Sequence, residues 1–290
     1  MSVYDNALSA RPNTAEIHSN KGVVYHDLGQ YEAAIQCYMR AIELRSDYPE
    51  AYYNLGNSLS DQGRHMESLS CYDQAISFKP NYHEALSNRG VNHHKLLQYE
   101  SAVADFDQAI ALCPSYFEAY SNKGVTLHKM GNYADAIEYF IKSLEIKSDF
   151  AQAASNLGTT YQEIGLYDQA MESYNRAISI DSDFEEGQWN KALLLLTLGQ
   201  YEEGFLQYEW RLRKSNPGYD VQSLRNIVPD VSSLQGSKVQ IVYEQGLGDV
   251  IMFMRYALEL IGRDIQVSMV VPKEVLEIAR TLDPRLEILG

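Results

Sequence analysis

Six asparagines recur along the chain at a constant interval of 34 residues. They are Asn20, Asn54, Asn88, Asn122, Asn156 and Asn190. A side-chain amide donates and accepts hydrogen bonds at once, so a column of amides can hold a peptide backbone irrespective of its sequence. At a net gain of about 0.5–1.5 kcal/mol per hydrogen bond, six such contacts predict useful but modest affinity. The column is therefore the principal candidate binding site.

A second polar column precedes the asparagines by four residues. It consists of Glu16, Glu50, Glu84, Glu118, Gln152 and Glu186. Residues four apart share a helix face, so the sequence predicts an acidic stripe beside an amide stripe. Structural roles compete with ligand binding in both columns. The carboxylates would lie in a first helical turn, where they suit the helix dipole, and the asparagines could join neighbouring repeats by hydrogen bonds.

Other residues with reactive side chains do not converge on a site. His26, His94 and His128 share one repeat position, but adjacent copies are too far apart to bind one metal ion, and we expect them to line a polar groove. Cys37 and Cys71 are one repeat apart, roughly 10 Å given helix packing distances. A disulfide needs Cα atoms within about 7 Å. We therefore expect reduced, buried thiols and no metal site.

The elements that position these residues follow from the same period, which is typical of a helical repeat array. The repeats are expected to begin at Ala15, Pro49, His83, Phe117, Ala151 and Glu185. The eighth residue of each is Gly or Ala, the twentieth is small and the twenty-fourth is aromatic. Small residues let two antiparallel helices approach closely, and the aromatic rings should fill the space between neighbouring pairs. Glycines such as Gly29 and Gly131 should end each first helix.

This pattern resembles the tetratricopeptide repeat over residues 1–214. The resemblance implies a mainly α right-handed superhelix whose first helices line an inner groove. Residues 1–14 align with the second half of a repeat and are expected to form a capping helix, and residues 15–214 should form six repeats, closed by Tyr208–Arg211. The asparagine column is similar to the asparagine ladder of the protein O-linked N-acetylglucosamine transferases, which holds extended substrate peptides. Groove lysines and arginines, which clamp a C-terminal carboxylate in other repeat proteins, are replaced by glutamates here, so that partner class is disfavoured.

The composition changes after residue 214. Residues 215–237 contain several prolines and glycines and are predicted to form a linker. Residues 238–290 are predicted to form strand, helix, strand, helix and strand, at Val239–Tyr243, Val250–Ile261, Gln266–Val271, Glu274–Leu282 and Leu286–Leu289. This order indicates a parallel sheet. Three strands would leave the sheet half covered, so we expect the chain to stop partway through a Rossmann-like α/β domain.

The turn after the first of these strands carries Gly246 and Gly248 and is followed by Asp249. Glycines in such a turn let a phosphate or sugar approach backbone N–H groups at a helix N-terminus. A dinucleotide fingerprint would need a glycine in place of Ile251 and an acidic residue after the next strand. Both are missing, and methyltransferase-type glycine loops fail at the same points. Neither cofactor is predicted.

The segment Glu244–Tyr256 resembles the first strand, loop and helix of the heptosyltransferase-like glycosyltransferases, which occur fused behind tetratricopeptide arrays in bacteria. The resemblance spans residues 199–290. It implies that Asp249 is the base that takes a proton from the acceptor hydroxyl, and a helix N-cap is the alternative role of this residue. The family binds its nucleotide-sugar donor mainly in a second Rossmann-like domain. We therefore expect no cofactor and no turnover from this chain unless that domain is present.

The net charge of −15 argues against nucleic acid or an anionic membrane as partner, because both need a basic surface. It favours neutral or basic protein partners, with self-association left open. No segment approaches the about 20 apolar residues of a membrane span, and the N-terminus lacks a signal-peptide core, so a cytoplasmic protein is expected. The predicted function is binding of extended peptides in the groove, as the recruiting part of a glycosyltransferase. The alternatives are a pure scaffold, or an active glycosyltransferase when the missing domain is present.

Overall fold

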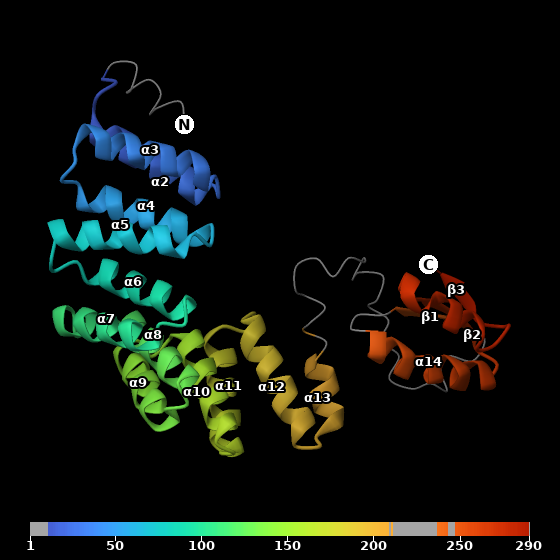
Figure 1. Ribbon diagram of the computed structural model, residues 1–290. Helices are drawn as coiled ribbons and strands as arrows, with labels where there is room; N and C mark the ends of the chain where they lie inside the picture. Colours follow the sequence, from blue (N-terminus) through green and yellow to red (C-terminus); the bar gives the residue numbers. More distant parts are fainter. Residues whose placement is uncertain (1–10, 209, 211–236, 243–246, 290) are drawn as a thin grey trace. The chain divides into compact units, whose positions relative to one another are not determined.

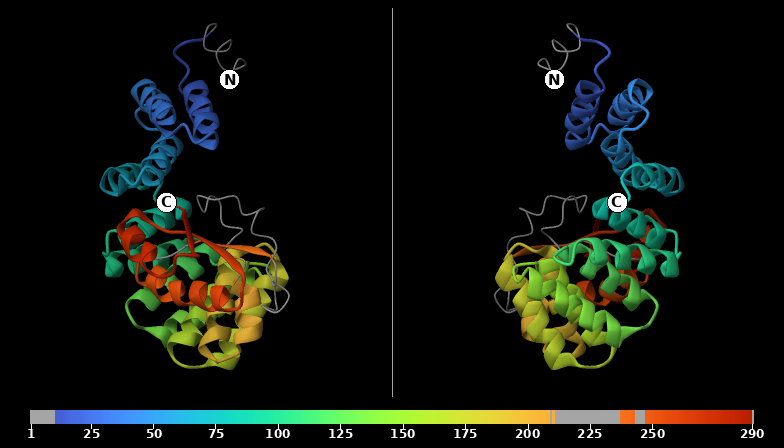
Figure 2. Two further views of the ribbon diagram at one scale, coloured as in Figure 1. Left: turned by 90° about the vertical axis from the view of Figure 1, so that its right-hand side faces the viewer. Right: turned by 90° about the vertical axis from the view of Figure 1, so that its left-hand side faces the viewer.

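The computed structural model describes residues 11–208, 210, 237–242 and 247–289, which fall into two units, Met1–Trp210 and Arg211–Gly290. In the first unit, helices follow one another as antiparallel pairs stacked in chain order (Figures 1 and 2). The first helices are α2 (Ala15–Asp27), α4 (Pro49–Asp61), α6 (His83–Lys95), α8 (Phe117–Lys129), α10 (Ala151–Glu163) and α12 (Glu185–Thr197). The second helices are α3 (Tyr31–Leu44), α5 (His65–Phe78), α7 (Tyr99–Leu112), α9 (Tyr133–Ile146), α11 (Tyr167–Ile180) and α13 (Tyr201–Tyr208).

Each first helix begins at the residue that the 34-residue period predicts. The array is thus mainly helical, as expected. Residues 1–10, which carry most of the predicted capping helix, lie outside the described residues, and residues 11–14 form a turn before α2. Most of the predicted linker and part of the closing segment Tyr208–Arg211 are also outside them. No helix among the described residues has the length and apolar composition needed to cross a membrane.

A glycine on the first helix sets the distance between the helices of a pair. A Cβ atom built on Gly56 would lie 2.7 Å from Cε1 of Tyr72, whose ring is 1% exposed. The same contact recurs in the first, third, fourth and fifth repeats. The aromatic ring therefore packs against the first helix of its own repeat, in addition to the predicted packing between neighbouring pairs. It reaches the next repeat, since Tyr38 forms one apolar cluster with Leu55 and Leu59.

Each turn between paired helices contains one residue in the left-handed backbone conformation. Gly29, Gly63, Gly131, Gly165 and Gly199 have φ angles between 71° and 81°, as the sequence predicts for a C-terminal glycine cap. The third repeat differs, because Leu97 adopts φ 61° at this place with its side chain 71% exposed. A non-glycine residue in this conformation costs roughly 1–2 kcal/mol. The rest of the turn holds it, with the N–H of Leu97 donating to the carbonyl of His94.

The cysteines form no disulfide, as predicted, but they are only partly buried. Cys37 and Cys71 lie within second helices, and Cys113 follows the end of α7. Burial nevertheless raises the pKa of Cys71 to about 11, mainly by desolvation of the thiolate. Such a thiol is protonated at neutral pH and therefore a weak nucleophile.

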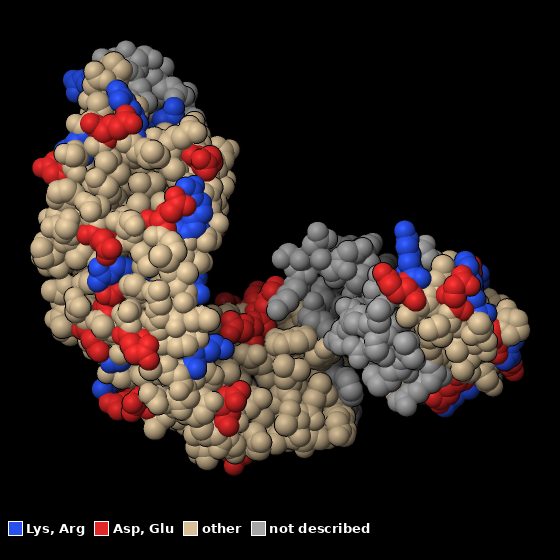
Figure 3. All heavy atoms as spheres, viewed as in Figure 1, with Lys and Arg blue, Asp and Glu red and all other residues tan. Residues whose placement is uncertain are grey.

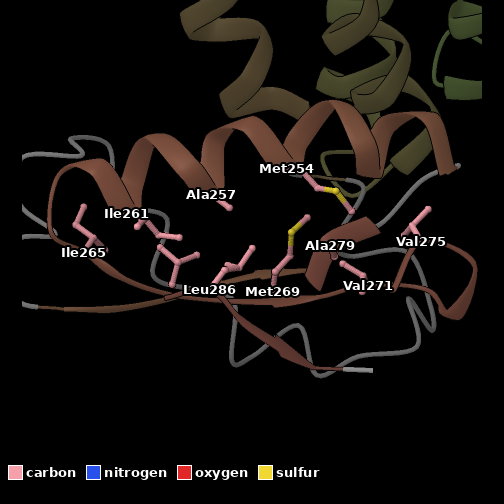
Figure 4. Close-up of a cluster of buried hydrophobic side chains, with 10 residues drawn as sticks. Met254, Ala257, Ile261, Ile265, Met269, Val271, Val275, Ala279 and Leu286 are labelled. Atoms are coloured by element: carbon pink, nitrogen blue, oxygen red, sulfur yellow. The ribbon is translucent and has the colours of Figure 1, made fainter. Parts of the chain in front are cut away.

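The second unit is a small parallel sheet with helices packed on it. Its elements are β1 (Lys238–Val242), α14 (Leu247–Gly262), β2 (Gln266–Val270), a 3₁₀ turn η4 (Lys273–Val275), α15 (Leu276–Arg280) and β3 (Glu287–Leu289). The strand order is β1-β2-β3, with Ile241 opposite Met269 and Met269 opposite Ile288. Met254 and Ile261 of α14 pack with Met269 in one buried cluster (Figure 4). The predicted element order is confirmed, although the second predicted helix is a 3₁₀ turn followed by a shorter α-helix.

Candidate functional site

The asparagine column lies on the first helices of the array. Each asparagine is the sixth residue of its helix, and each first helix contacts the first helix of the next repeat. The structure therefore places the predicted column on six neighbouring helices. Asn20 is exposed, whereas the other five asparagines are partly buried. These five side-chain amides fall into two classes: those that form hydrogen bonds within the protein, and those that form none, which we call open.

Asn88 belongs to the first class. Its Nδ2 donates to Oδ1 of Asn57 at 2.9 Å and to the hydroxyl of Tyr53 at 3.1 Å, both in the preceding repeat. Oδ1 of Asn57 also accepts from the hydroxyl of Tyr72 at 2.7 Å. Both N–H groups of Asn88 are therefore occupied, and its carbonyl oxygen remains available to accept a hydrogen bond from a ligand.

The last two repeats show related arrangements. Nδ2 of Asn190 donates to Oγ of Ser155 in the preceding repeat at 3.3 Å. Oδ1 of Asn156 accepts from Nε2 of Gln152 at 3.3 Å, and the same nitrogen donates to Glu186 at 3.1 Å. The alternative role of joining repeats is thus seen at Asn88 and Asn190.

The remaining amides are open. Within the described residues, the side chains of Asn20, Asn54 and Asn122 form no hydrogen bond. Asn54 and Asn122 are partly buried and flank Asn88 on either side along the array. A polar group that folding partly removes from water, without supplying a partner, gains from a ligand that does supply one.

The acidic column is tied largely to the protein itself. Arg45 donates to Glu16 at 2.5 Å, and Lys79 lies 3.9 Å from Glu50. Both cations directly follow the end of a second helix, where a positive charge suits the helix dipole. Oε2 of Glu118 differs, because it is buried without a hydrogen-bond partner among the described residues. The five glutamates of the column lie in the first turn of their helices, which agrees with the helix-dipole role that the sequence left open.

A cavity of about 280 Å³ lies between the first three repeats. Its lining includes His26, Asn57, Ser60, Asp61, Tyr72, Asn88, Val91 and Lys95. Pockets that enclose a drug-sized ligand measure about 300–1,000 Å³. This cavity is therefore better suited to one side chain of a bound segment than to a cofactor. The described residues contain no group of three or more side chains that could hold a metal ion.

The histidines have a role that the sequence analysis missed. The twelfth residue of one first helix forms a hydrogen bond with the tenth residue of the next. The pairs are His26–Ser58 at 2.9 Å, Ser60–Asn92 at 2.7 Å, His94–Thr126 at 3.0 Å and His128–Thr160 at 3.0 Å. The histidines therefore join repeats rather than simply line a groove. Their constant separation of 32 residues from a hydroxyl or amide side chain was the available signal.

Burial makes two of these histidines sensitive to pH. Desolvation, followed by the charge of Lys129, lowers the pKa of both His94 and His128 below the usual value of about 6.5. The unfolded chain then binds more protons than the folded chain at pH values between the lowered pKa and about 6.5, so stability rises with pH there. We expect the free energy of unfolding to decrease as the pH falls below about 7.

Urea unfolding between about pH 5.5 and 7.5 measures this dependence. The variant His94→Asn/His128→Asn should show a flatter curve, because an amide can keep a hydrogen bond without titrating. An unchanged slope in the variant would mean that other groups cause the pH dependence.

The candidate catalytic residue lies in the second unit. Asp249 is the third residue of α14, in its first turn. The helix begins at Leu247, so Asp249 is inside it, which corrects the alternative that this residue is the N-cap. Gly248 is the second residue of the helix, and Gly246 lies outside the described residues.

Comparison with known proteins identifies the repeats. Family models for the tetratricopeptide repeat match residues 24–63 and 98–131, residues 115–183, and residues 49–82. Together these ranges cover residues 24–82 and 98–183, and they end within the helical array. The comparison with curated proteins gives no match.

Several solved structures share the fold. YrrB, described as a tetratricopeptide repeat protein with an unusual peptide-binding site, is 24% identical with a TM-score of 0.50, over 63% of this chain and 95% of that chain. PilF of Pseudomonas aeruginosa is 19% identical with a TM-score of 0.61, over 74% of this chain and 98% of that chain. The Cut9–Hcn1 hetero-tetramer of the APC/C is 17% identical with a TM-score of 0.67, over 78% of this chain and 45% of that chain. At these identities the similarity shows the fold alone.

Proposed function

We propose that this chain, which belongs to the tetratricopeptide repeat family, is a protein-interaction module that binds an extended peptide segment along its first helices. The observation that carries the proposal is the pair of partly buried amides of Asn54 and Asn122, which have no hydrogen-bond partner among the described residues. A peptide backbone offers N–H and C=O groups that match both ends of an amide. YrrB, which has a peptide-binding site, supports the proposal at the level of the fold.

The hydrogen bonds that Asn88 and Asn156 form within the protein limit which backbone groups of a peptide they can bind. Asn88 has used its two N–H groups, so its oxygen would accept from a peptide N–H, whereas Asn156 has used its oxygen and would donate to a peptide C=O. Neighbouring helices lie about 8–10 Å apart, and an extended chain rises about 3.3 Å per residue. The column would therefore contact the backbone about once in every three peptide residues.

The expected partner is a protein segment that is neutral or basic overall, because the chain carries a net charge of −15. On the face seen in Figure 3, acidic and basic side chains are interspersed over the array, which is unlike the basic patch that nucleic-acid binding requires. The cytoplasmic location expected from the sequence remains part of this proposal.

A peptide-array screen with the intact chain and its variant Asn54→Ala/Asn122→Ala tests the proposal. Two lost hydrogen bonds should weaken peptide binding about 5- to 150-fold. The melting temperature should remain unchanged, because these side chains form no hydrogen bond within the described residues. The variant Asn88→Ala/Asn190→Ala is the matched control, since it breaks bonds between repeats and should lower the melting temperature. Equal binding by the wild type and the first variant would refute the proposal.

A glycosyltransferase whose repeats recruit a protein acceptor is the second candidate. The position of Asp249 in the first turn of α14, the helix that follows β1 in the sequence, favours it. The resemblance assigns most donor binding to a second Rossmann-like domain, so we expect sugar transfer only when that domain is present. Incubation with labelled nucleotide sugars and a selected peptide checks this expectation. Transfer that disappears in Asp249→Asn would make the enzyme the better account.

A further inference from the structure

Two neighbouring first helices carry the same line of four residues on one face. Residues at spacings of four, three and four share a face of an α-helix. In α6 the line is Glu84, Asn88, Val91 and Lys95, and in α8 it is Glu118, Asn122, Val125 and Lys129. The other first helices end this line with Asp27, Asp61, Glu163 and Thr197. Among the first helices, only α6 and α8 therefore end this line with a cation.

These two lysines differ from most others in the array. Lys95 and Lys129 are exposed, and neither forms an ion pair or hydrogen bond within the described residues. By contrast, Lys79, Lys123, Lys142 and Lys191 each lie within 4.0 Å of a carboxylate oxygen. Each of the two lysines is the last residue of its helix, where a positive charge suits the helix dipole. Because neither has an acidic partner within the described residues, both ammonium groups are available to a ligand.

The junction between α6 and α8 gathers positive charge around one fixed side chain. Nδ1 of His94 and the hydroxyl of Thr126 are 3.0 Å apart, which holds the imidazole between the two helices. Burial first, and then the charges of Lys129 and Lys95, lower the pKa of this imidazole. The ammonium groups of Lys95 and Lys129 therefore both lie close enough to His94 to lower its pKa. Lys95 also lines the 280 Å³ cavity that contains Asn88.

We propose that Lys95 and Lys129 bind two acidic side chains of the extended segment that the asparagine column holds, an inference that rests on the proposed function. Side chains of an extended chain alternate between its two sides. Residues on one side are thus about 6.6 or 13 Å apart at separations of two or four. Neighbouring first helices lie about 8–10 Å apart, and long flexible lysines can accommodate the difference. The acidic residues are therefore two or four positions apart.

The charges around the two lysines restrict the rest of the segment. Asp61 and Glu163 continue the same line on the helices before and after, and they repel further acidic residues. Glu84 and Glu118 lie eleven residues from the lysines, roughly 16 Å along each helix, beyond the asparagines on the same line. The partner chemistry is therefore an acidic pair within a neutral or basic segment. A continuous polyanion such as nucleic acid would meet repulsion on three sides.

Titration calorimetry at low salt tests this inference. The probes are peptides of about 12 residues, roughly 40 Å when extended. They share a host sequence taken from the array screen and carry Glu/Glu, Gln/Gln or Lys/Lys at two positions four apart, with a second set two apart. The Glu/Glu peptide of at least one set should bind wild type about 3- to 10-fold more tightly than its Gln/Gln peptide. The charge reversal Lys95→Glu/Lys129→Glu should instead prefer the Lys/Lys peptide.

The variant Arg40→Glu/Lys142→Glu is the control, because it changes the net charge equally at two exposed side chains of the second helices α3 and α9. It should keep the wild-type preference. If all peptides bind with equal affinity to wild type and to the reversed variant, the charge inference is wrong while peptide binding stands. If no peptide binds, the proposed function fails and this inference fails with it. Tighter binding of a DNA oligonucleotide than of any peptide would also overturn it.

Discussion

Replacing Asp105 by alanine is expected to lower the free energy of unfolding by about 3 kcal/mol. Asp105 is 5% exposed and accepts two hydrogen bonds from Arg89, at 2.9 Å from Nε and 2.5 Å from Nη2. The variant leaves the Arg89 guanidinium, which is 20% exposed, without its inner partner. Only the exposed Asp73 at 2.7 Å would remain, so most of the cost of desolvating this charge stays uncompensated. Urea unfolding followed by circular dichroism measures the loss.

Other repeats supply the control for this prediction. In the fifth repeat, Leu157 and Ser173 stand at the places of Arg89 and Asp105. The variant Arg89→Leu/Asp105→Ser recreates that pair and removes both charges together. It should recover most of the stability lost in Asp105→Ala, because replacing both members of a buried ion pair is often nearly neutral. If the double variant were less stable than the single one, the uncompensated charge would not be the cause of the loss.

Replacing Gly56 by leucine is expected to destabilise the array by about 3 kcal/mol, at the upper end for overpacking. The first added carbon would lie 2.7 Å from Cε1 of Tyr72, and this ring cannot easily move. The Tyr72 hydroxyl donates to Asn57, and Oγ of Ser68 donates to the Gly56 carbonyl at 2.6 Å, so both sides of the contact are fixed. The two helices must separate, which breaks the packing of the second repeat.

Thermal melting of Gly56→Leu and of Gly262→Leu forms a matched pair. Gly262 is the last residue of α14, and a Cβ atom there would meet nothing within 4 Å. Leucine at Gly262 should therefore leave stability within about 0.5 kcal/mol. A Gly56→Leu protein that melts like wild type would show that the helix pair can open without cost, contrary to the packing described for this repeat.

The repeat architecture could be predicted from the sequence because every helix pair shows the same residue pattern. Ala15 and Glu185 begin their helices as expected, since the period repeats the same small and aromatic contacts six times. Leu97 shows the limit of this reasoning. Its turn takes the left-handed conformation without a glycine, because hydrogen bonds of the same turn hold it, with the N–H groups of Leu97 and Gln98 donating to the preceding helix.

The sequence could not predict which polar side chains form hydrogen bonds within the protein, because these bonds depend on contacts between repeats. Asn88 and Asn122 occupy the same place in the sequence pattern. Asn88 is hydrogen-bonded because the preceding repeat carries Asn57 and Tyr53, whereas the repeat before Asn122 carries Val91 and Ser87 at those places. A column of identical residues therefore divides into structural and open amides only when its neighbours are known.

The claim that open amides hold a peptide backbone is tested most directly by a double-mutant cycle. Calorimetry would compare wild type and Asn122→Ala, each with a selected peptide and with copies N-methylated at one backbone nitrogen at a time. At one position, the two changes should show a coupling of about 0.5–1.5 kcal/mol, since each removes the same hydrogen bond. Strictly additive losses at every position would contradict the account, because Asn122 would then affect binding without contacting the backbone N–H groups.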